Sequence, residues 1–204
     1  ANQGEYAEVY AACGGRVIAV EPNPSFRDRL IALSRSANIT PLFVAVGSTP
    51  GKAELNVCSN AAYSTLAAAD AGWMKESPDY DGVEWTHKVE VEVVTLAQLA
   101  EQYGVPSYVK IDVEGFELEV LKGMAAVPNY LSFEFGARRM ADALKCLDHL
   151  AARGFQSFRP ITGRHYAFAT PRWMKADEAL AWLNGFTIET GEFGDMFASF
   201  QARD

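Results

Sequence analysis

Cysteine, histidine and basic side chains are all scarce in this sequence, and each shortage argues against a class of protein. Its 204 residues include three cysteines and three histidines, without a CxxC pair or the Cys/His spacing of a metal site. Lysine and arginine number 18 against 26 acidic residues, so the chain lacks the basic surface that nucleic-acid binding requires. No apolar run approaches the ~18 residues that span a bilayer. We therefore expect a small-molecule ligand, and no metal ion, nucleic acid or membrane.

The remaining composition is that of an ordinary globular protein. Hydrophobic residues make up 49% and charged residues 22%, which argues against intrinsic disorder and against a disulfide scaffold. Cys13, Cys58 and Cys146 each have apolar neighbours in the sequence. This pattern favours reduced, buried thiols in a cytoplasmic protein.

Apolar stretches alternate with amphipathic ones, which predicts an α/β fold with a mostly parallel sheet. The expected strands are 16–21, 41–46, 105–112 and 129–135. The expected helices are 5–13, 25–37, 95–103 with Thr95 as N-cap, 114–124 and 138–153. An insertion, 53–94, should hold two half-exposed strands, 53–58 and 87–94, around a long loop. In the tail we expect segments 155–161 and 165–170, a helix at 176–184 and an antiparallel edge strand at 196–203.

Open α/β sheets bind ligands beyond the carboxyl ends of their strands, and Glu21 ends such a strand. It lies 17 residues after Gly4, and nucleotide-binding units place a carboxylate on the ribose hydroxyls about 20 residues past their glycine turn. A carboxylate suits this role because both of its oxygens accept hydrogen bonds. The alternative is a solvated acidic residue before the turn formed by Pro22, Asn23 and Pro24.

A second charged strand end is formed by Lys110, Asp112 and Glu114. Alternation along an extended chain would place these three side chains on one side. Charges in a central strand are costly unless they are paired or functional. Glu134 repeats the pattern on the next strand. Two interpretations remain open: a site for a cationic or hydroxyl-rich ligand, and a lysine–carboxylate pair that covers the edge of the sheet.

The segment VKIDVEGFELEVLKGM (109–124) resembles the signature of the FkbM-type methyltransferase family, which has a KIDVEG-E-VL-G pattern. RVIAVEPNP (16–24) and LSFEF (131–135) are similar to the family's second-strand and fifth-strand segments, and Ala1–Gly4 resembles the end of its DVGAN-x-G motif. The strand and the Asp-Val-Gly that normally come first are missing before Ala1. We therefore expect the natural chain to extend upstream.

The resemblance implies one domain over 1–204, a class I S-adenosylmethionine-dependent O-methyltransferase with a Rossmann-like sheet. By this likeness Asn2 and Gly4 line the methionine end of the cofactor, and Glu21 holds its ribose. The residues implied for the adenine side are Pro22, Asn23, Ala45 and Val46. Asp112 and Glu114 would face the transferred methyl group, with Glu134 nearby.

Methyl transfer to a hydroxyl group needs in-line alignment and a base that removes the proton. Asp112 is the first candidate for this base, because a carboxylate desolvated among like charges has a raised pKa and is a better base. His165 is the second candidate. Lys110 is expected to pair with a carboxylate. The acceptor would be a hydroxyl group on a saccharide or a polyketide-like compound.

The stretch 59–85 is long for a compact domain and is a candidate binding loop. Its aromatic residues, Trp73, Tyr80 and Trp85, either stack on the acceptor or anchor the loop, and Ser64 and Thr65 are candidates to contact a ligand. Trp173 and Trp182 are expected to pack in the tail.

Two alternative functions remain open from the sequence. One is an NAD-dependent oxidoreductase, although GEYAEV lacks the further glycines of a GxGxxG turn. The other is a catalytically silent binding domain with the same fold.

Overall fold

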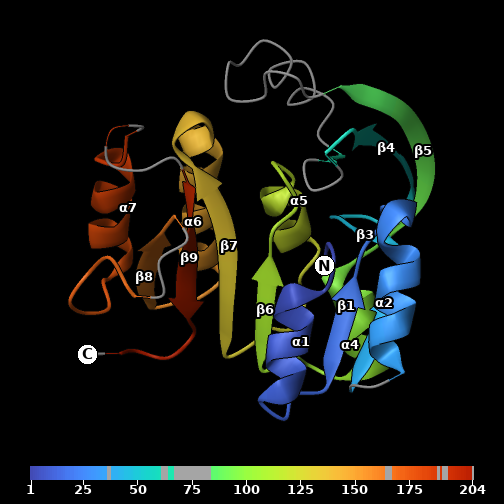
Figure 1. The fold of residues 1–204 in the computed structure, drawn as a ribbon. Coiled ribbons are helices and arrows are strands. Elements are labelled where there is room, and N and C mark those ends of the chain that lie inside the picture. The colour runs from blue at the N-terminus through green and yellow to red at the C-terminus, as the bar shows by residue number, and fades with distance from the viewer. Residues whose placement is uncertain are drawn as a thin grey trace. The chain divides into compact units, whose positions relative to one another are not determined.

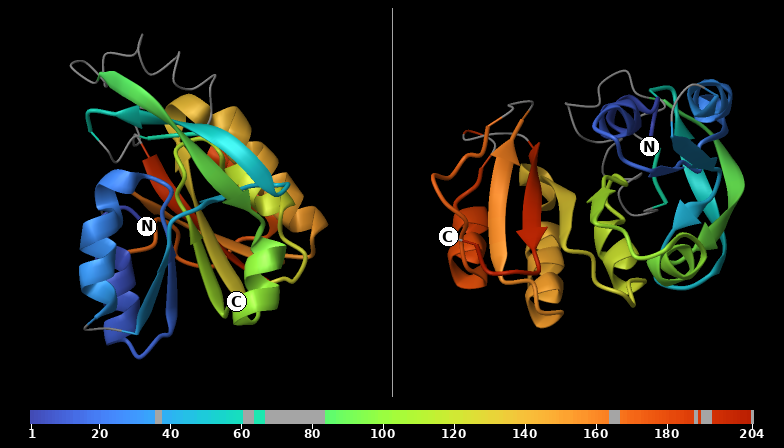
Figure 2. Two further views of the ribbon diagram at one scale, coloured as in Figure 1. Left: turned by 90° about the vertical axis from the view of Figure 1, so that its right-hand side faces the viewer. Right: turned by 90° about the horizontal axis from the view of Figure 1, so that it is seen from below.

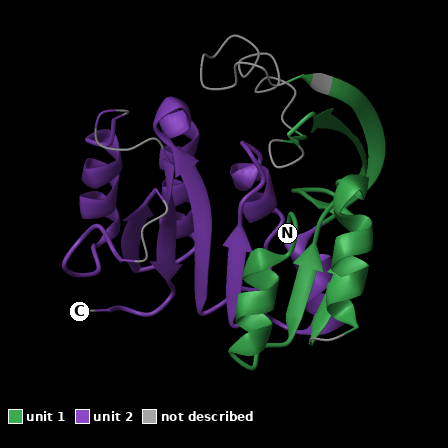
Figure 3. Cartoon of the chain, in the orientation of Figure 1, with its two compact units in different colours: residues 1–94 green, residues 95–204 purple. Residues whose placement is uncertain are grey.

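The protein has a mixed α/β fold with several sheets (Figure 1). The computed structural model describes residues 1–35, 38–60, 64–66, 84–163, 167–187, 189 and 193–203, without the side chain of Trp85. The chain divides into two compact units, Ala1–Val94 and Thr95–Asp204 (Figure 3). The single domain over 1–204 stays a prediction.

The first unit begins with a small α/β layer. Its elements are α1 (Glu5–Ala12), β1 (Val17–Val20), the 3-10 turn η1 (Pro24–Phe26), α2 (Arg27–Ser34) and β2 (Ile39–Leu42). Strands β1 and β2 pair in parallel, with Val17 opposite Ile39. Their apolar side chains and those of the two helices form one core, which contains Ala7, Ala19, Phe26, Leu30, Leu33 and Ile39. This packing holds the start of α1 and the end of β1 in place.

A second sheet completes the first unit. It contains β3 (Ala45–Val46), β4 (Gly51–Cys58) and β5 (Trp85–Val94), in the order β3-β5-β4. Strand β5 is parallel to β3 and antiparallel to β4. The side chains of Ala45, Leu55, Val57, Val91 and Val93 form its core. The two half-exposed strands expected within 53–94 are therefore present and pair with each other.

The second unit contains one four-stranded sheet with helices packed on it. Its elements are α4 (Leu96–Tyr103), β6 (Tyr108–Ile111), α5 (Glu117–Lys122), β7 (Tyr130–Gly136), η4 (Ala137–Arg139), α6 (Met140–Ala152), β8 (Ser157–Thr162), α7 (Ala176–Asn184) and β9 (Phe193–Ser199). The strand order is β6-β7-β9-β8. Helices α6 and α7 contact each other beside this sheet (Figure 2). Phe133, Phe158 and Met196 are fully buried in its core.

The sheets are not mostly parallel among the described residues. Parallel pairs join β1 to β2, β3 to β5 and β6 to β7, whereas β4–β5, β7–β9 and β8–β9 are antiparallel. The last strand is antiparallel as expected, but it lies between β7 and β8 rather than at the edge. A single Rossmann-like sheet therefore stays a prediction.

Three expected elements differ most from the structure. The strand expected at 41–46 is divided between β2 and β3, because the chain leaves one sheet at Leu42 and joins another at Ala45. The final strand ends at Ser199, not Arg203, because Ser199 lies opposite the first residues of both β7 and β8. The described part of the segment expected at 165–170 is not a strand.

The side-chain expectations outside the site are mostly confirmed. Cys58 and Cys146 are buried free thiols, but Cys13 is exposed because it caps the end of α1. Trp182 packs against Phe135 and Phe186, with ring centroids 5.9 Å and 5.4 Å apart. Among the described residues, no helix combines the length and the apolar character needed to cross a membrane.

Candidate active site

The Asn2–Gly4 turn is shaped by backbone conformations that few residues adopt. Asn2 has a φ of 53° and Gly4 a φ of 86°, and the Gly4 N–H donates to the carbonyl oxygen of Ala1 at 3.0 Å. A Cβ on Gly4 would lie only 2.5 Å from Cδ1 of Leu33. Glycine is therefore required here both by the left-handed backbone and by the close packing of α1 on α2.

Glu21 lies just beyond β1, and only 8% of it is exposed. Its Oε2 accepts from the backbone nitrogens of Asn2 at 2.6 Å and Ala1 at 3.0 Å, and its Oε1 accepts from the Asn23 N–H at 2.8 Å. The interpretation of Glu21 as a solvated residue is therefore wrong. A carboxylate offers about four acceptor positions, so these three bonds leave about one for a ligand.

Asn23 is buried, and its side chain joins the start of η1 to Ser64. Its Oδ1 accepts from the Ser25 N–H at 3.0 Å and caps η1. Its Nδ2 donates to the hydroxyl oxygen of Ser64 at 3.0 Å, and that oxygen also accepts from the Cys58 N–H at 3.3 Å. Thr65 is buried as well and bridges to Asn56.

The other residues implied for the adenine side lie in different surroundings. Pro22 and Val46 are half-buried, whereas Ala45 is buried in the core of the β3-β5-β4 sheet. Their contacts with a cofactor stay predictions, as do those of Asn2, Gly4 and Asn23.

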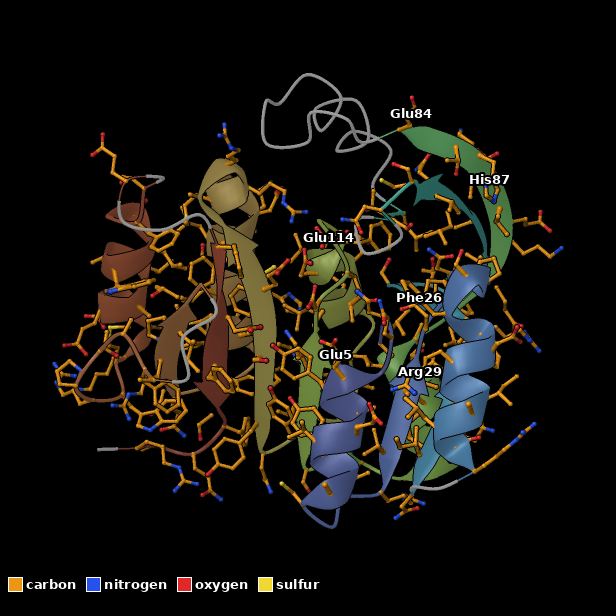
Figure 4. All side chains as sticks on the ribbon, viewed as in Figure 1. Glu5, Phe26, Arg29, Glu84, His87 and Glu114 are labelled. Carbon is orange, nitrogen blue, oxygen red and sulfur yellow. The ribbon has the colours of Figure 1, made fainter. Side chains whose placement is uncertain are left out.

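In the second unit, the chain turns sharply after β6 instead of continuing as an extended strand. Glu114 has a φ of 54° and Gly115 a φ of 101°. The alternation of side chains between the two sides of an extended strand, expected for Lys110, Asp112 and Glu114, therefore ends at this turn. The turn places Glu114 beside α5 (Figure 4).

Lys110 is confirmed as a paired residue. Its side chain is 13% exposed, and its ammonium group lies 2.8 Å from Oδ1 of Asp195 and 3.2 Å from Oδ2 of Asp112. Burial alone would lower the pKa of Lys110, but the two carboxylates outweigh it and raise the pKa. Lys110 is therefore a fixed cation that neutralises part of the acidic strand end.

Asp112, Glu114 and Glu134 come together in what we call the carboxyl cluster. Their carboxylate oxygens lie within 4.8 Å of one another. A cation suits such a cluster, and the guanidinium group of Arg139 lies beside it. Its Nη2 is 3.4 Å from Oε2 of Glu114 and 3.9 Å from Oε2 of Glu134. The expectation that the protein has no metal site stays a prediction.

Burial controls the protonation of this cluster. Burial raises the pKa of Glu114 to about 7, against the attraction of Arg139 and with the help of the charges on Asp112 and Glu117. The pKa of Glu134 is raised well above its usual value by burial and by its acidic neighbours. The cluster can therefore gain or lose a proton near neutral pH.

The raised pKa of Glu114 should make folding stability depend on pH. Between about pH 4.5 and pH 7 the folded protein keeps a proton that the unfolded chain has released. Glu114 should then make the free energy of unfolding fall as pH rises through this window, and its own contribution to the slope is at most about 1.4 kcal/mol per pH unit. Urea unfolding at several pH values would measure this slope, and Glu114→Gln should flatten it. An equal slope in the variant would contradict the raised pKa.

A small hollow with a cavity volume of about 10 Å³ adjoins the cluster. Its lining includes Gly115, Glu117, Glu134, Arg139 and Cys146. A cavity needs roughly 10–15 Å³ to hold one water molecule, so the hollow has room for about one water and not for a ligand.

Three residues of the site did not emerge from the sequence. Arg139 could have been found as a cation directly after the strand that carries Glu134, and Glu117 as the next charge in the KIDVEG segment. Asp195 gave no signal, because its partner Lys110 is 85 residues away.

Several sequence candidates lie outside the described residues. They are His165, Trp73 and Tyr80, together with the side chain of Trp85.

A mixed α/β fold with acidic side chains at the carboxyl ends of its parallel strands is typical of nucleotide-cofactor enzymes. The chain belongs to the FkbM methyltransferase family: the family model described as "Methyltransferase FkbM domain" matches residues 1–187. This confirms the resemblance that the KIDVEG segment carries.

A curated relative agrees with this family. The chain is similar to the hexuronic acid methyltransferase AglP of Haloferax volcanii, with 32% identity over 121 residues. The match covers 57% of this chain and 44% of that relative, so the chain spans less than half of the relative's length.

Proposed function

We propose that this protein is an S-adenosylmethionine-dependent O-methyltransferase that acts on a hydroxyl group of a saccharide. The observation that carries this proposal is the buried Glu114, whose pKa of about 7 suits a base that removes a hydroxyl proton. Family membership supports methyl transfer, and the name of the relative supports a sugar acceptor.

The donor set of the first unit fits the ribose of S-adenosylmethionine. Glu21 accepts from the backbone N–H groups of Asn2 and Asn23 and from the amino group of Ala1, and it keeps about one acceptor position for a ribose hydroxyl. The residues of the first unit that would hold the cofactor are Asn2, Gly4, Glu21, Pro22, Asn23, Ala45 and Val46. When bound, the cofactor supplies an activated methyl group.

Within the second unit, Glu114 suits the base better than Asp112. Asp112 is 37% exposed and is paired with Lys110, whereas Glu114 is 16% exposed beside Arg139. Ionised Glu114 would accept the proton of the acceptor hydroxyl at a carboxylate oxygen. Arg139 would then keep that carboxyl group oriented in both of its protonation states.

Calorimetry and a methyl-transfer assay test this function together. We expect S-adenosylmethionine to bind and NAD not to bind. Three candidate acceptors are then tested separately: a neutral hexose, a hexuronic acid and a polyketide lactone. We expect S-adenosylhomocysteine to form when one of the two sugars is the acceptor. Binding of NAD alone would instead support the oxidoreductase, and binding of neither cofactor would support the silent domain. Turnover with the lactone alone would replace the saccharide by a polyketide-like acceptor.

A further inference from the structure

Glu117 is a buried carboxylate that faces the backbone of the neighbouring turn rather than solvent. Only 6% of it is exposed, at the first turn of α5. Its Oε1 accepts from the Val113 N–H at 3.1 Å, and its Oε2 accepts from the Gly115 N–H at 3.1 Å. The two donors flank Glu114 in the chain, so Glu117 holds the backbone on both sides of that residue.

The turn needs such a constraint because Glu114 is not a glycine. A φ of 54° is uncommon for a residue with a long side chain, and it persists only where the surroundings enforce it. Without an acceptor at Glu117, the N–H groups of Val113 and Gly115 would lose this partner. The turn would then relax toward a more common backbone conformation, and the Glu114 side chain would point in a different direction.

Glu117 also contributes charge to Glu114. Among the described residues, the groups that face Glu114 include Arg139 from η4, Asp112 from the end of β6, Glu134 from β7 and Glu117 from α5. Arg139 favours ionised Glu114, whereas Asp112 and Glu117 oppose it. The geometric and the electrostatic effects of Glu117 can be separated, because a shorter acid keeps the charge but not the reach.

We propose that Glu117 is a positioning residue: it clamps the turn Asp112–Gly115 and thereby orients the carboxyl group of Glu114 for the proposed proton transfer. This inference rests on the proposed function for its kinetic consequences. Its structural consequences can be measured without turnover.

The experiment compares Glu117→Gln and Glu117→Asp with Glu119→Gln. Glu119 is a matched control, because it lies on the same helix but pairs with Lys122 at the surface. Hydrogen exchange of the Val113 and Gly115 amides reports the clamp, and carboxyl carbon NMR reports the titration of Glu114. The kinetic measurements are kcat and the KM for S-adenosylmethionine.

Glu117→Gln keeps one acceptor oxygen and replaces the other by an amide NH₂ group, so we expect faster exchange mainly of the Gly115 amide, together with a lower pKa of Glu114. We also expect kcat to fall ~10²-fold, the cost of misplacing a reacting group by about 1 Å. The KM for S-adenosylmethionine should stay unchanged. Glu117→Asp should keep the raised pKa of Glu114 but lose amide protection and kcat, whereas Glu119→Gln should behave as the wild type.

Amides of Val113 and Gly115 that exchange freely in the folded wild type would overturn the clamp, even if no Glu117 variant folds. A Glu117→Asp variant with the kcat of the wild type would contradict the proposal that Glu117 orients Glu114 through its hydrogen bonds to the turn. A wild-type protein that transfers no methyl group would contradict the proposed function instead. In that case the exchange and titration measurements still decide the role of Glu117.

Discussion

Replacing Glu114 by glutamine should lower kcat for methyl transfer by ~10²–10⁴-fold, the usual contribution of a general base. Glutamine has nearly the same shape and keeps an oxygen for Arg139, whose Nη2 lies 3.4 Å from the Glu114 carboxylate. It cannot accept the hydroxyl proton. The loss should therefore appear in kcat, with little change in the KM for S-adenosylmethionine. Steady-state kinetics with the preferred sugar would measure it.

The pH profile gives this prediction its control. Wild-type kcat should rise as pH increases through about 7, because Glu114 acts as a base only when ionised. Asp112→Asn should cost less and should keep that rise, since Asp112 is the more exposed carboxylate and is paired with Lys110. A larger loss of kcat in Asp112→Asn than in Glu114→Gln would instead identify Asp112 as the general base.

Replacing Glu21 by alanine should weaken the binding of S-adenosylmethionine by ~10–100-fold, because a hydrogen bond to a charged group contributes about 1.5–3 kcal/mol. The variant removes the proposed ribose acceptor. It also removes the acceptor of the Asn2 and Asn23 N–H groups, at 2.6 Å and 2.8 Å, so the turn before α1 loses its anchor. Titration calorimetry well below the unfolding temperature would measure the dissociation constant.

Two further variants separate these effects. Glu21→Gln keeps one acceptor oxygen but turns an amide group toward a backbone donor, so its affinity should lie between those of the wild type and Glu21→Ala. Glu54→Gln is the control, because Glu54 is an exposed acid of the same unit and pairs with Lys88. Equal affinity in Glu21→Ala and Glu54→Gln would refute the ribose assignment.

Local patterns were the most predictable part of the fold. Thr95 was expected as an N-cap, and its Oγ1 accepts from the Gln98 N–H at 3.1 Å while Gln98 Oε1 accepts from the Thr95 N–H at 3.0 Å. The motif forms because all of its atoms lie within four residues of chain. Strand β1 and helix α7 were also predictable from a local signal, because the apolar pattern of each lies within its own segment.

Strand partners were less predictable, because periodicity does not reveal which sheet a strand joins. The apolar run at 41–46 looks continuous, yet β2 pairs with β1 and β3 pairs with β5. The final strand could be expected to be antiparallel, but not to lie between β7 and β8.

The sequence by itself determined the family and the acidic character of two strand ends, because the KIDVEG segment, Glu21 and Glu134 are read directly along the chain. Only the tertiary structure decided what each acid does. Glu21 accepts backbone N–H groups, Asp112 pairs with Lys110, and Glu114 is buried beside Arg139. The physical reason is that burial and neighbouring charge set a carboxyl group's protonation, and both come from residues far away in the sequence.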